Sequence, residues 1–448
     1  MKNQTPRPAS LLKSRKSLYL AIAAASQLIA SVQVIAAPEG GKIVGGQGAI
    51  SQTGLNTRVD QYTDRMAIDW KNFNVSAEER VEFLQPDASS IALNRVLSHS
   101  GSEIHGQIES NGQVILVNPN GVFFGENSRI NVGGMIASGL QINSDDFLNG
   151  EFTFAAVDGA EGKVVNAGII NAATGGSVTL IGQHVKNEGL ISAKLGTVNL
   201  AAGKEAVVTF ESNGLVGVKI SKAILQDELG IDAAVINSGE INAEGGKILL
   251  TASVSQDIFS QAVNSGGIGD ARSVVIHEDG SFTLGAGADV VNTGTLSAST
   301  EAGSAGRIVA LGDNVTNFGG ITADSRLGSG GSVEIHSVNT TEIRGQGVVS
   351  AKSTHQGKGG DVKILGSKVG IFDQSDVSTS GANGGGEILI GGDQSGGNPL
   401  VRNAEFIFID NDVSITADGL LIGDGGRLIT FASDTARIRG DLDRKSVV

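Results

Sequence analysis

One phrase recurs through the second part of the chain and restricts what it can fold into. The phrase reads Asn, any residue, Gly, any residue, Ile or Leu, a small or polar residue, and Ala, and a glycine-started apolar alternation follows it. Copies of the phrase begin at Asn166, Asn187, Asn237, Asn292 and Asn317, and the alternations begin at Gly176, Gly196, Gly246, Gly331, Gly360, Gly386 and Gly426. The closest copies lie about 20 to 29 residues apart, which is the length of one coil of a repeat protein.

This repeat predicts a β-solenoid, in which each coil consists of two or three short strands with glycine at the corners. Alternation places Val178 and Leu180 inside a coil and Thr179 on the solvent side, because successive side chains of a strand point in opposite directions. By the same rule Val333 and Ile335 point inward and Glu334 outward. A single coil cannot bury its inner face, so we expect each coil to stack on its neighbours and the ends to need caps.

The composition supports ordered β-structure. Glycine accounts for 65 of 448 residues and aromatic residues for 4%, but the glycines separate short Val, Ile and Leu runs instead of forming low-complexity tracts. Jelly rolls and sandwiches also use many short strands, yet they do not predict phrases repeated at coil length. A propeller requires a longer period with aromatic signatures, and the chain contains one tryptophan.

The asparagine at the head of each phrase has two interpretations. In the first, the side chain hydrogen-bonds a corner backbone, or the asparagines stack as a ladder from coil to coil. In the second, the asparagines form a row of ligands for calcium or sugar. Calcium-binding solenoids need dense aspartate ligands in a sustained Gly-Gly-x-Gly-x-Asp pattern, which this chain lacks. The structural interpretation is therefore favoured.

The first 36 residues are predicted to be a signal peptide. Five cations precede an apolar run from Leu18 to Ile35, and cleavage is expected near Ala36. A membrane anchor is the alternative, although polar residues interrupt the run. Loss of the five cations would change the net charge from −14 to −19, which argues against binding to nucleic acid or anionic lipid through bulk charge. Cysteine is absent, so disulfides and thiolate chemistry are excluded.

A tetrapeptide in the first part of the chain, Asn118-Pro119-Asn120-Gly121, follows the apolar run Val114–Val117. Proline fixes φ, and Asn120-Gly121 is suited to the positive φ angles of a tight turn. The local prediction is strand, turn, strand, and a β-hairpin is its simplest form.

The sequence segments around this tetrapeptide resemble those of a known family. They include Ile68–Val75, Val81–Pro86, Ala92–Val96 and Asn131–Ser138, and the match runs in order over about residues 43–145. Together they resemble the N-terminal secretion domain of filamentous-haemagglutinin-type exoproteins, which Gram-negative bacteria export by two-partner secretion. The chain departs from the family pattern at Glu109–Gly112 and at Ser98–Gly101.

The resemblance implies an all-β fold, namely a right-handed parallel β-helix (a single-stranded solenoid) with an N-terminal cap and extrahelical strands. It implies a signal peptide at 1–36, a secretion-domain core at 37–160 and continuing β-helix repeats at 161–448, in a short exoprotein or a truncated longer one. Asn118, Pro119, Asn120 and Gly121 would form the secretion motif. The secretion-domain core would include Trp70, Phe73, Phe83, Leu93, Asn94 and Arg95, with Phe123 and Phe124 also expected inside.

The expected partners are the POTRA domains of a cognate outer-membrane β-barrel transporter, met in the periplasm, and an unidentified receptor or glycan. The expected product is a secreted or surface-bound adhesin or haemagglutinin that is not an enzyme and needs no cofactor or metal. Two alternatives remain, the stem of a toxin-delivery exoprotein and a polysaccharide-active β-helix enzyme. The enzyme would draw a carboxylate pair from Asp361, Asp373, Asp376, Asp410 and Asp412. Six histidines are scattered, and only His99 and His105 lie close in sequence.

Overall fold

The computed structural model describes residues 37–210, 216–222, 235–244, 246–251, 274–276, 282–284 and 289–447. The predicted signal peptide lies outside these residues and stays a prediction. The described residues from Ala37 onward belong to one compact unit.

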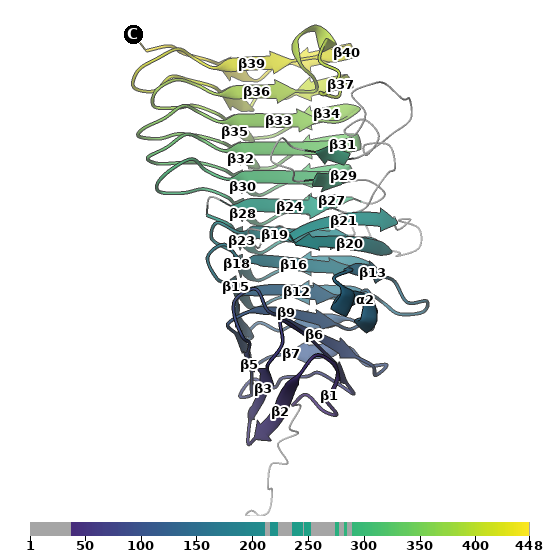
Figure 1. Ribbon diagram of the computed structural model, residues 1–448. Coiled ribbons are helices and arrows are strands. Elements are labelled where there is room, and N and C mark those ends of the chain that lie inside the picture. Colours follow the sequence, from purple (N-terminus) through teal and green to yellow (C-terminus); the bar gives the residue numbers. More distant parts are fainter. Residues whose placement is uncertain are drawn as a thin grey trace, which may run out of the picture. The chain divides into compact units, whose positions relative to one another are not determined.

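Three short strands make one coil, and successive coils stack in parallel with matched registers (Figure 1). Val164 on β14 (Lys163–Asn166) lies beside Val185 on β17 (His184–Asn187), and the other two strands of the same coils pair in the same way. The alternating pattern of the repeat therefore places equivalent apolar residues directly above one another. The predicted parallel β-helix is confirmed.

The strands stack into three faces, which we name A, B and C. Face A contains β4 (Arg65–Trp70), β6 (Ile91–Val96), β9 (Gln113–Val117), β12 (Gly134–Ser138), β16 (Ser177–Gly182), β19 (Thr197–Ala202), β24 (Lys247–Thr251), the first parts of β29 (Arg307–Asn317) and β31 (Ser332–Ile343), β33 (Asp361–Leu365), β36 (Glu387–Ile390) and β39 (Arg427–Thr430). Face B contains β7 (Ser102–Ile104), β10 (Val122–Phe124), β14, β17, β22 (Val235–Asn237), β27 (Val290–Asn292), the second parts of β29 and β31, β34 (Lys368–Ile371), β37 (Ala404–Ile409) and β40 (Ala432–Ile438). Face C contains β3 (Asn56–Gln61), β5 (Arg80–Leu84), β8 (Gln107–Ser110), β11 (Arg129–Val132), β15 (Ile169–Ala172), β18 (Leu190–Ser192), β23 (Glu240–Asn242), β28 (Thr295–Ser297), β30 (Gly320–Thr322), β32 (Val348–Ser350), β35 (Asp376–Ser378), β38 (Ser414–Thr416) and β41 (Asp441–Asp443).

The core is a continuous apolar column between the three faces, and it runs from Val59 to Ala417. Val178, Leu180, Val333 and Ile335 point into it, as the alternation predicts. Thr179 and Glu334 point outward but are buried, which corrects the expectation that they face solvent. The reason is contact between neighbouring coils, because Thr179 Oγ1 accepts a hydrogen bond from Asn199 at 2.9 Å and Glu334 pairs with Arg307 at 2.9 Å.

The five phrase asparagines form a buried ladder at the corner between faces B and C. The amide of each asparagine donates to the side-chain oxygen of the next, at 2.8 Å from Asn166 to Asn187, 2.8 Å to Asn237, 2.9 Å to Asn292 and 2.7 Å to Asn317. Each amide also donates to the carbonyl of the glycine two residues later. The ladder interpretation is confirmed, and a row of exposed ligands is wrong because these side chains are at most 2% exposed.

A glycine directly precedes the face A strands of the repeat from β16 onward, because coils approach too closely there for a side chain. A Cβ added to Gly196 would lie 1.7 Å from the carbonyl oxygen of Gly176 on the preceding coil, and one added to Gly386 would lie 1.9 Å from that of Gly360. These distances are far inside van der Waals contact. The glycine half of the repeat is therefore a packing requirement between stacked backbones.

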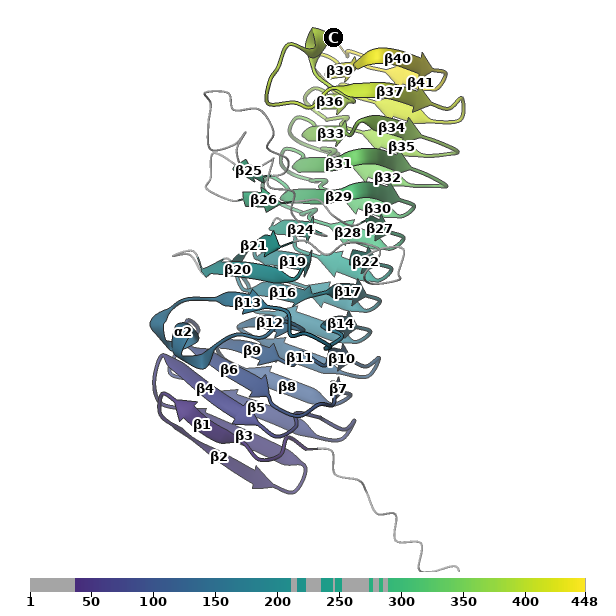
Figure 2. The ribbon, with the colours of Figure 1, turned by 90° about the vertical axis from the view of Figure 1, so that its right-hand side faces the viewer.

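An N-terminal cap closes the first coil (Figure 2). The strand β1 (Lys42–Gly45) pairs antiparallel with β4, and β2 (Gly48–Thr53) pairs antiparallel with β3. These antiparallel strands end the parallel stack and confirm the cap that the family resemblance implies.

Extrahelical segments cover the outer side of face A over the first coils. They are α2 (Ser144–Asn149), β13 (Thr153–Ala155), β20 (Glu205–Phe210) and β21 (Val216–Lys222), and β13, β20 and β21 form an antiparallel sheet. Phe147 and Phe154 of this cover pack on outward residues of face A such as Ile115 and Ile136 in a second apolar cluster. Two further short elements are the antiparallel pair β25 (Val274–Ile276) and β26 (Phe282–Leu284) and the 3₁₀ turn η1 (Gln394–Gly396).

Candidate functional site

The Asn118–Gly121 tetrapeptide is the corner between β9 on face A and β10 on face B. The amide N–H of Gly121 donates to the Asn118 carbonyl at 2.9 Å, and the Asn118 side-chain oxygen accepts from the Asn120 N–H at 3.0 Å. The strand, turn, strand prediction is confirmed, but the hairpin is wrong because β9 and β10 pair with neighbouring coils. Within the tetrapeptide, Gly121 has a positive φ of 111°. Asn120 does not, although the sequence predicted positive φ there as well.

Asn118 is fully buried and holds the turn against two other coils. Its side-chain amide donates at 3.0 Å to the Ser100 carbonyl and to Ser102 Oγ on the preceding coil. Its backbone N–H donates to the Ser138 carbonyl on the following coil at 2.9 Å. Asparagine fits this position because one side chain supplies an acceptor for its own turn and donors for the neighbouring coil.

The rest of the turn reaches the same two neighbours. The Asn120 amide donates to the Ser98 carbonyl at 2.9 Å, and the Pro119 carbonyl accepts from the Gly162 N–H at 2.9 Å. The tetrapeptide therefore joins three successive coils. Sequence reasoning could not identify Ser98, Ser138 or Gly162 as partners, because they contribute backbone groups and leave no side-chain signal.

Four of the expected core residues lie inside the first coils. Trp70, Phe73, Phe83 and Asn94 are at most 1% exposed. The Trp70 indole N–H donates to Asn94 Oδ1 at 2.9 Å, and its ring meets Phe73 edge to face at 5.4 Å between centroids. The indole N–H would otherwise be a buried, unsatisfied donor, so Asn94 is the polar partner that allows a tryptophan in this core.

Leu93 and Arg95 instead point to the outer side of face A. Leu93 is buried beneath the extrahelical cover. Arg95 makes two hydrogen bonds to Asp69, at 2.8 and 2.9 Å, and a third to the Ile142 carbonyl at 3.3 Å. Arg95 therefore ties face A to the cover. Phe124 is in the inner core, whereas Phe123 is half-buried on the outside, 5.8 Å from the His105 ring.

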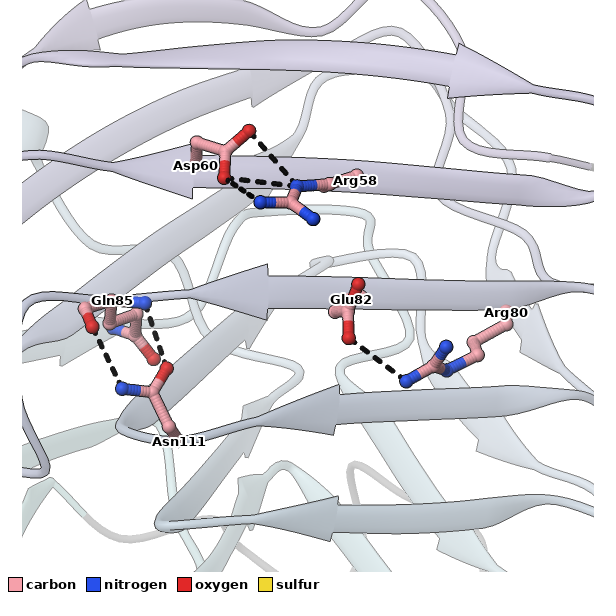
Figure 3. A network of polar contacts seen from close by, with 6 residues as sticks. All are labelled: Arg58, Asp60, Arg80, Glu82, Gln85 and Asn111. Atoms are coloured by element: carbon pink, nitrogen blue, oxygen red, sulfur yellow. Dashed lines mark hydrogen bonds and ion pairs between the residues drawn. The ribbon is translucent and has the colours of Figure 1, made fainter.

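A polar network braces the first coils on face C (Figure 3). Arg58 pairs with Asp60 at 2.8 Å, and Arg80 pairs with Glu82 at 2.9 Å and with Glu109 on the next coil. The hydrogen bond to Glu109 raises the pKa of Arg80.

The segment Glu109–Gly112, where the chain departs from the family pattern, has a clear role in this network. Asn111 bonds the backbone N–H of Gln85 at 2.8 Å and its carbonyl at 2.7 Å, as Figure 3 shows. Its side chain thus continues the strand ladder past the end of β8. Glu109 and Asn111 of this segment both contact the preceding coil.

The five acids considered for an enzyme are spread over the outer surface. Asp361 is on face A, where burial and then the nearby Glu387 raise its pKa. Asp376 starts β35 on face C, and Asp373 caps a corner by accepting from the Gly345 N–H at 2.8 Å. Asp410 and Asp412 flank Asn411 at another corner. None of them lines the described pockets of about 940, 330, 210 and 190 Å³.

His99 and His105 do not form a shared site. His99 lines the 330 Å³ pocket beside the tetrapeptide, whereas His105 lies 3.5 Å from Glu103. Within the described residues, no group of three His, Asp or Glu side chains is placed to hold a metal ion. Over the same residues, no helix has the length and apolar character needed to cross a membrane.

Comparison with known proteins agrees with this architecture. The family model for the TPS secretion domain matches residues 35–298. The crystal structure of the HMW1 secretion domain from Haemophilus influenzae superposes with a TM-score of 0.64 at 28% identity, covering 92% of this chain and 91% of that one.

Two curated relatives are both heme/hemopexin-binding proteins of Haemophilus influenzae. One, from strain ATCC 51907 / DSM 11121 / KW20 / Rd, is 35% identical over 223 residues, which is 48% of this chain and 23% of the relative. The other is 37% identical over 102 residues, which is 22% of this chain and 11% of the relative. The matched part of the chain thus spans less than a quarter of either relative. Because the family model covers more than half of the chain and the β-helix, cap and cover agree with it, the chain belongs to the family of TPS (two-partner secretion) secretion domains.

Proposed function

We propose that this chain is the exported partner of a two-partner secretion system. It crosses the periplasm, is recognised by the POTRA domains of a cognate outer-membrane β-barrel transporter, and acts at the cell surface or in the medium. The observation that carries the proposal is the Asn118–Gly121 corner, which joins three coils at the start of a domain of the TPS family.

The corner supports export through folding. Each coil is stabilised mainly by the coil before it, so the first coils set the register for all later ones. A turn that fixes three coils at once gives the stack a defined starting point. Folding of successive coils as they emerge outside the cell would then favour outward movement without a nucleotide.

Secretion assays test this proposal. The wild type and the Asn118→Ala/Asn120→Ala variant are expressed with and without the transporter encoded beside this gene, and the protein is quantified in the medium and periplasm. We expect the wild type in the medium only with the transporter, and at least tenfold less of the double variant. Asn171→Ala is the matched control, because Asn171 is an asparagine on the outer side of face C whose side-chain amide donates to Asn131 Oδ1 at 3.0 Å.

Two results would contradict the proposal. The first is secretion of the wild type without the transporter. The second is an Asn171→Ala variant that is lost from the medium as completely as the double variant, because the defect would then not belong to the motif.

We further propose that the exported chain acts as an adhesin or haemagglutinin. The support is a long, acidic, disulfide-free solenoid with extended outer faces, a type of surface that repeat proteins use for binding. The test is attachment of beads coated with the purified chain to erythrocytes and epithelial cells. Beads coated with an unrelated acidic protein are the control, and equal attachment by both would contradict the proposal.

A second candidate function is binding of haem or of hemopexin. It rests on the 35% identity over 223 residues to a heme/hemopexin-binding protein. Titration of the purified chain with haem, with hemopexin and with the haem–hemopexin complex would distinguish this role from adhesion. Binding to any of the three, together with no attachment to cells, would favour the second candidate.

A further inference from the structure

A cleft of about 940 Å³ lies between the extrahelical cover and the corners that lead into face A. Its lining residues precede or begin five successive face A strands, from β4 through β6, β9 and β12 to β16. Because stacked strands are about 4.8 Å apart, the cleft follows the stack for roughly 19 Å. Both its volume and its length suit an extended ligand molecule.

The cover supplies an apolar wall to this cleft. Leu148 of α2, Phe152 and Phe210 of β20 all line it, and the rings of Phe152 and Phe210 lie 4.6 Å apart between centroids. Ile91, at the start of β6, adds an aliphatic group from the stack. Leu148 and Phe210 are half-buried, so part of each side chain is open to the cleft. A ligand with an apolar body would gain free energy by covering this wall.

The corners supply polar groups to the same cleft. Ser89, Asn111 and Thr174 line it, together with the backbone at Gly175. Asp64, at the corner before β4, is the carboxylate of the lining and is exposed. A lining that is apolar on the cover and polar at the corners favours an amphiphilic ligand over a wholly apolar one.

Arg65 places a cation at one end of the cleft, on the first of the five strands. Its Nη1 donates to the Leu148 carbonyl at 3.0 Å, and its guanidinium carbon lies 5.7 Å from the centroid of the Phe152 ring. Within the described part of the chain Arg65 forms no ion pair, whereas Arg80 and Arg95 pair with carboxylates. A guanidinium carries five donors in a fork that matches a carboxylate. Most of the Arg65 donors therefore remain for a ligand.

We propose that this cleft binds a free long-chain fatty acid, with its carboxylate on Arg65 and its acyl chain against the cover. Three features specify this occupant: the length of the cleft, the apolar wall, and a cation at one end that no carboxylate of the described chain neutralises. A lipid bilayer fits less well, because the lining lies between the cover and the stack and the net charge of −14 repels anionic headgroups. This binding activity goes beyond export and does not depend on it.

Calorimetric titration of the purified chain with palmitate tests the proposal. Methyl palmitate is the uncharged comparison, and we expect the wild type to bind it at least about tenfold more weakly, the loss that a charge-assisted hydrogen bond implies. Arg65→Gln should weaken palmitate binding by the same factor and leave methyl palmitate binding unchanged. Arg129→Gln is the matched control, because Arg129 is an exposed arginine on face C that does not line the cleft.

Two further variants leave Arg65 in place, since its bond to Leu148 also holds the cover. Ala88 is exposed and lines the cleft, so Ala88→Trp should fill it and weaken palmitate and methyl palmitate alike. Ala77→Trp is its control, because Ala77 is an exposed alanine on a corner outside the cleft. Asp64→Asn removes the carboxylate of the lining, and it should strengthen palmitate binding without changing methyl palmitate binding.

The thermal unfolding midpoint of each variant shows whether the cover is intact. If Arg65→Gln loosens the cover, Ala88→Trp and Asp64→Asn decide the question. Equal affinity of the wild type for palmitate and methyl palmitate would overturn the assignment, as would a folded Ala88→Trp variant that binds palmitate normally. If the chain sediments with phosphatidylglycerol vesicles but does not bind free palmitate, the surface recognises a membrane and the fatty-acid site is wrong.

Discussion

At the scale of single residues, this domain uses asparagine in two different ways. In the buried ladder, Asn166 to Asn317 join one coil to the next through side-chain amides. In the Asn118–Gly121 corner, one asparagine satisfies its own turn and the preceding coil together. In both places the amide group supplies donor and acceptor at once, which no apolar residue and no carboxylate can do.

Replacement of a ladder residue should therefore be costly. Asn187→Ala removes the acceptor of Asn166 and the donor to Asn237, and leaves buried amide groups without partners. We expect the free energy of unfolding to fall by about 1–3 kcal/mol, as measured by urea denaturation. Asn171→Ala on the outer side of face C should change it by less than about 0.5 kcal/mol. Equal effects from the two would show that the ladder has no special role.

His336 should make the stability of the domain sensitive to acid. It lies half-buried on the outer side of face A, in register with Leu311 and Leu365 on the adjoining coils. Burial lowers its pKa to about 4, while Glu334 raises the pKa and Arg402 lowers it further.

The sign of the effect follows from proton binding. Between about pH 6.5 and pH 4 the unfolded chain binds more protons at this histidine than the folded chain, so stability decreases as pH falls through that range. We expect the urea midpoint of the wild type to fall between pH 7 and pH 5, and to fall less in His336→Gln. An identical change in both proteins would exclude His336 as the cause.

At the scale of elements, the cover is the feature that distinguishes the first coils from the later ones. The helix α2 and the strands β13, β20 and β21 bury a second apolar cluster on the outer side of face A. The Phe152 ring contacts Phe147 and Phe210 there, with ring centroids 5.8 and 4.6 Å apart, respectively. Arg65 adds a hydrogen bond to the Leu148 carbonyl at 3.0 Å. The cover is thus attached by apolar packing and by cations from face A.

Loss of a buried ring in the cover should promote local unfolding of the cover while the coils stay folded. Phe154→Ala removes a fully buried side chain, and substitutions of this kind cost about 3–5 kcal/mol. We expect faster hydrogen exchange and proteolysis in residues 141–160, with protection of the inner strands retained. Thr153→Ala, an exposed neighbour on the same strand, is the control. Simultaneous loss of protection in β9 and β12 would show that cover and coils unfold together.

At the scale of the whole described unit, the stack limits the strand pairing of each coil to its neighbouring coils. Each parallel strand pairs only with the strands above and below it, as Figure 1 shows. In such repeat architectures the free energy of unfolding is close to a sum of the intrinsic stability of each coil and the free energy of each interface between neighbouring coils. Distant parts can therefore unfold separately. The single tryptophan, Trp70, lies in the first coils and reports on that region alone.

This separation can be measured with one variant. Ile364→Ala removes buried apolar volume from a late coil, at a cost of about 2–5 kcal/mol. We expect the urea transition followed by circular dichroism to begin earlier, while the transition followed by Trp70 fluorescence changes little. Lys363→Ala, the outward neighbour on the same strand, is the control. Equal shifts in both signals would mean that the described unit unfolds as one cooperative block.

The repeat was sufficient to predict the fold because its information is local. Alternation in segments such as Gly176–Leu180 specifies which side chains point inward, and matched spacing specifies that they stack. The same local rule failed at Thr179 and Glu334, since outward does not mean exposed where neighbouring coils supply partners. It also failed at Asn120, where the turn needs positive φ only at Gly121.

The candidate site was only partly predictable. The tetrapeptide identifies a turn, and the surrounding sequence segments identify a family. The hydrogen-bond partners of the turn, however, include the backbone carbonyls of Ser98, Ser100 and Ser138. Every residue carries a backbone carbonyl whatever its side chain, so the sequence gives no indication of which carbonyl accepts a hydrogen bond. The pocket beside the turn is assembled from four segments between residues 95 and 160, and its existence depends on how the cover ends.

The sequence by itself therefore determined the solenoid and the family, because these follow from periodicity and from contiguous sequence segments, but it left open whether the repeat asparagines bond a corner backbone or stack as a ladder. Only the tertiary structure decided that Asn118 is hidden while Pro119 and Asn120 remain accessible, that Arg95 ties face A to the cover, and that a pocket lies beside the motif. The physical reason is that burial and enclosure depend on segments distant in sequence, whereas alternation and turn geometry depend on neighbours along the chain.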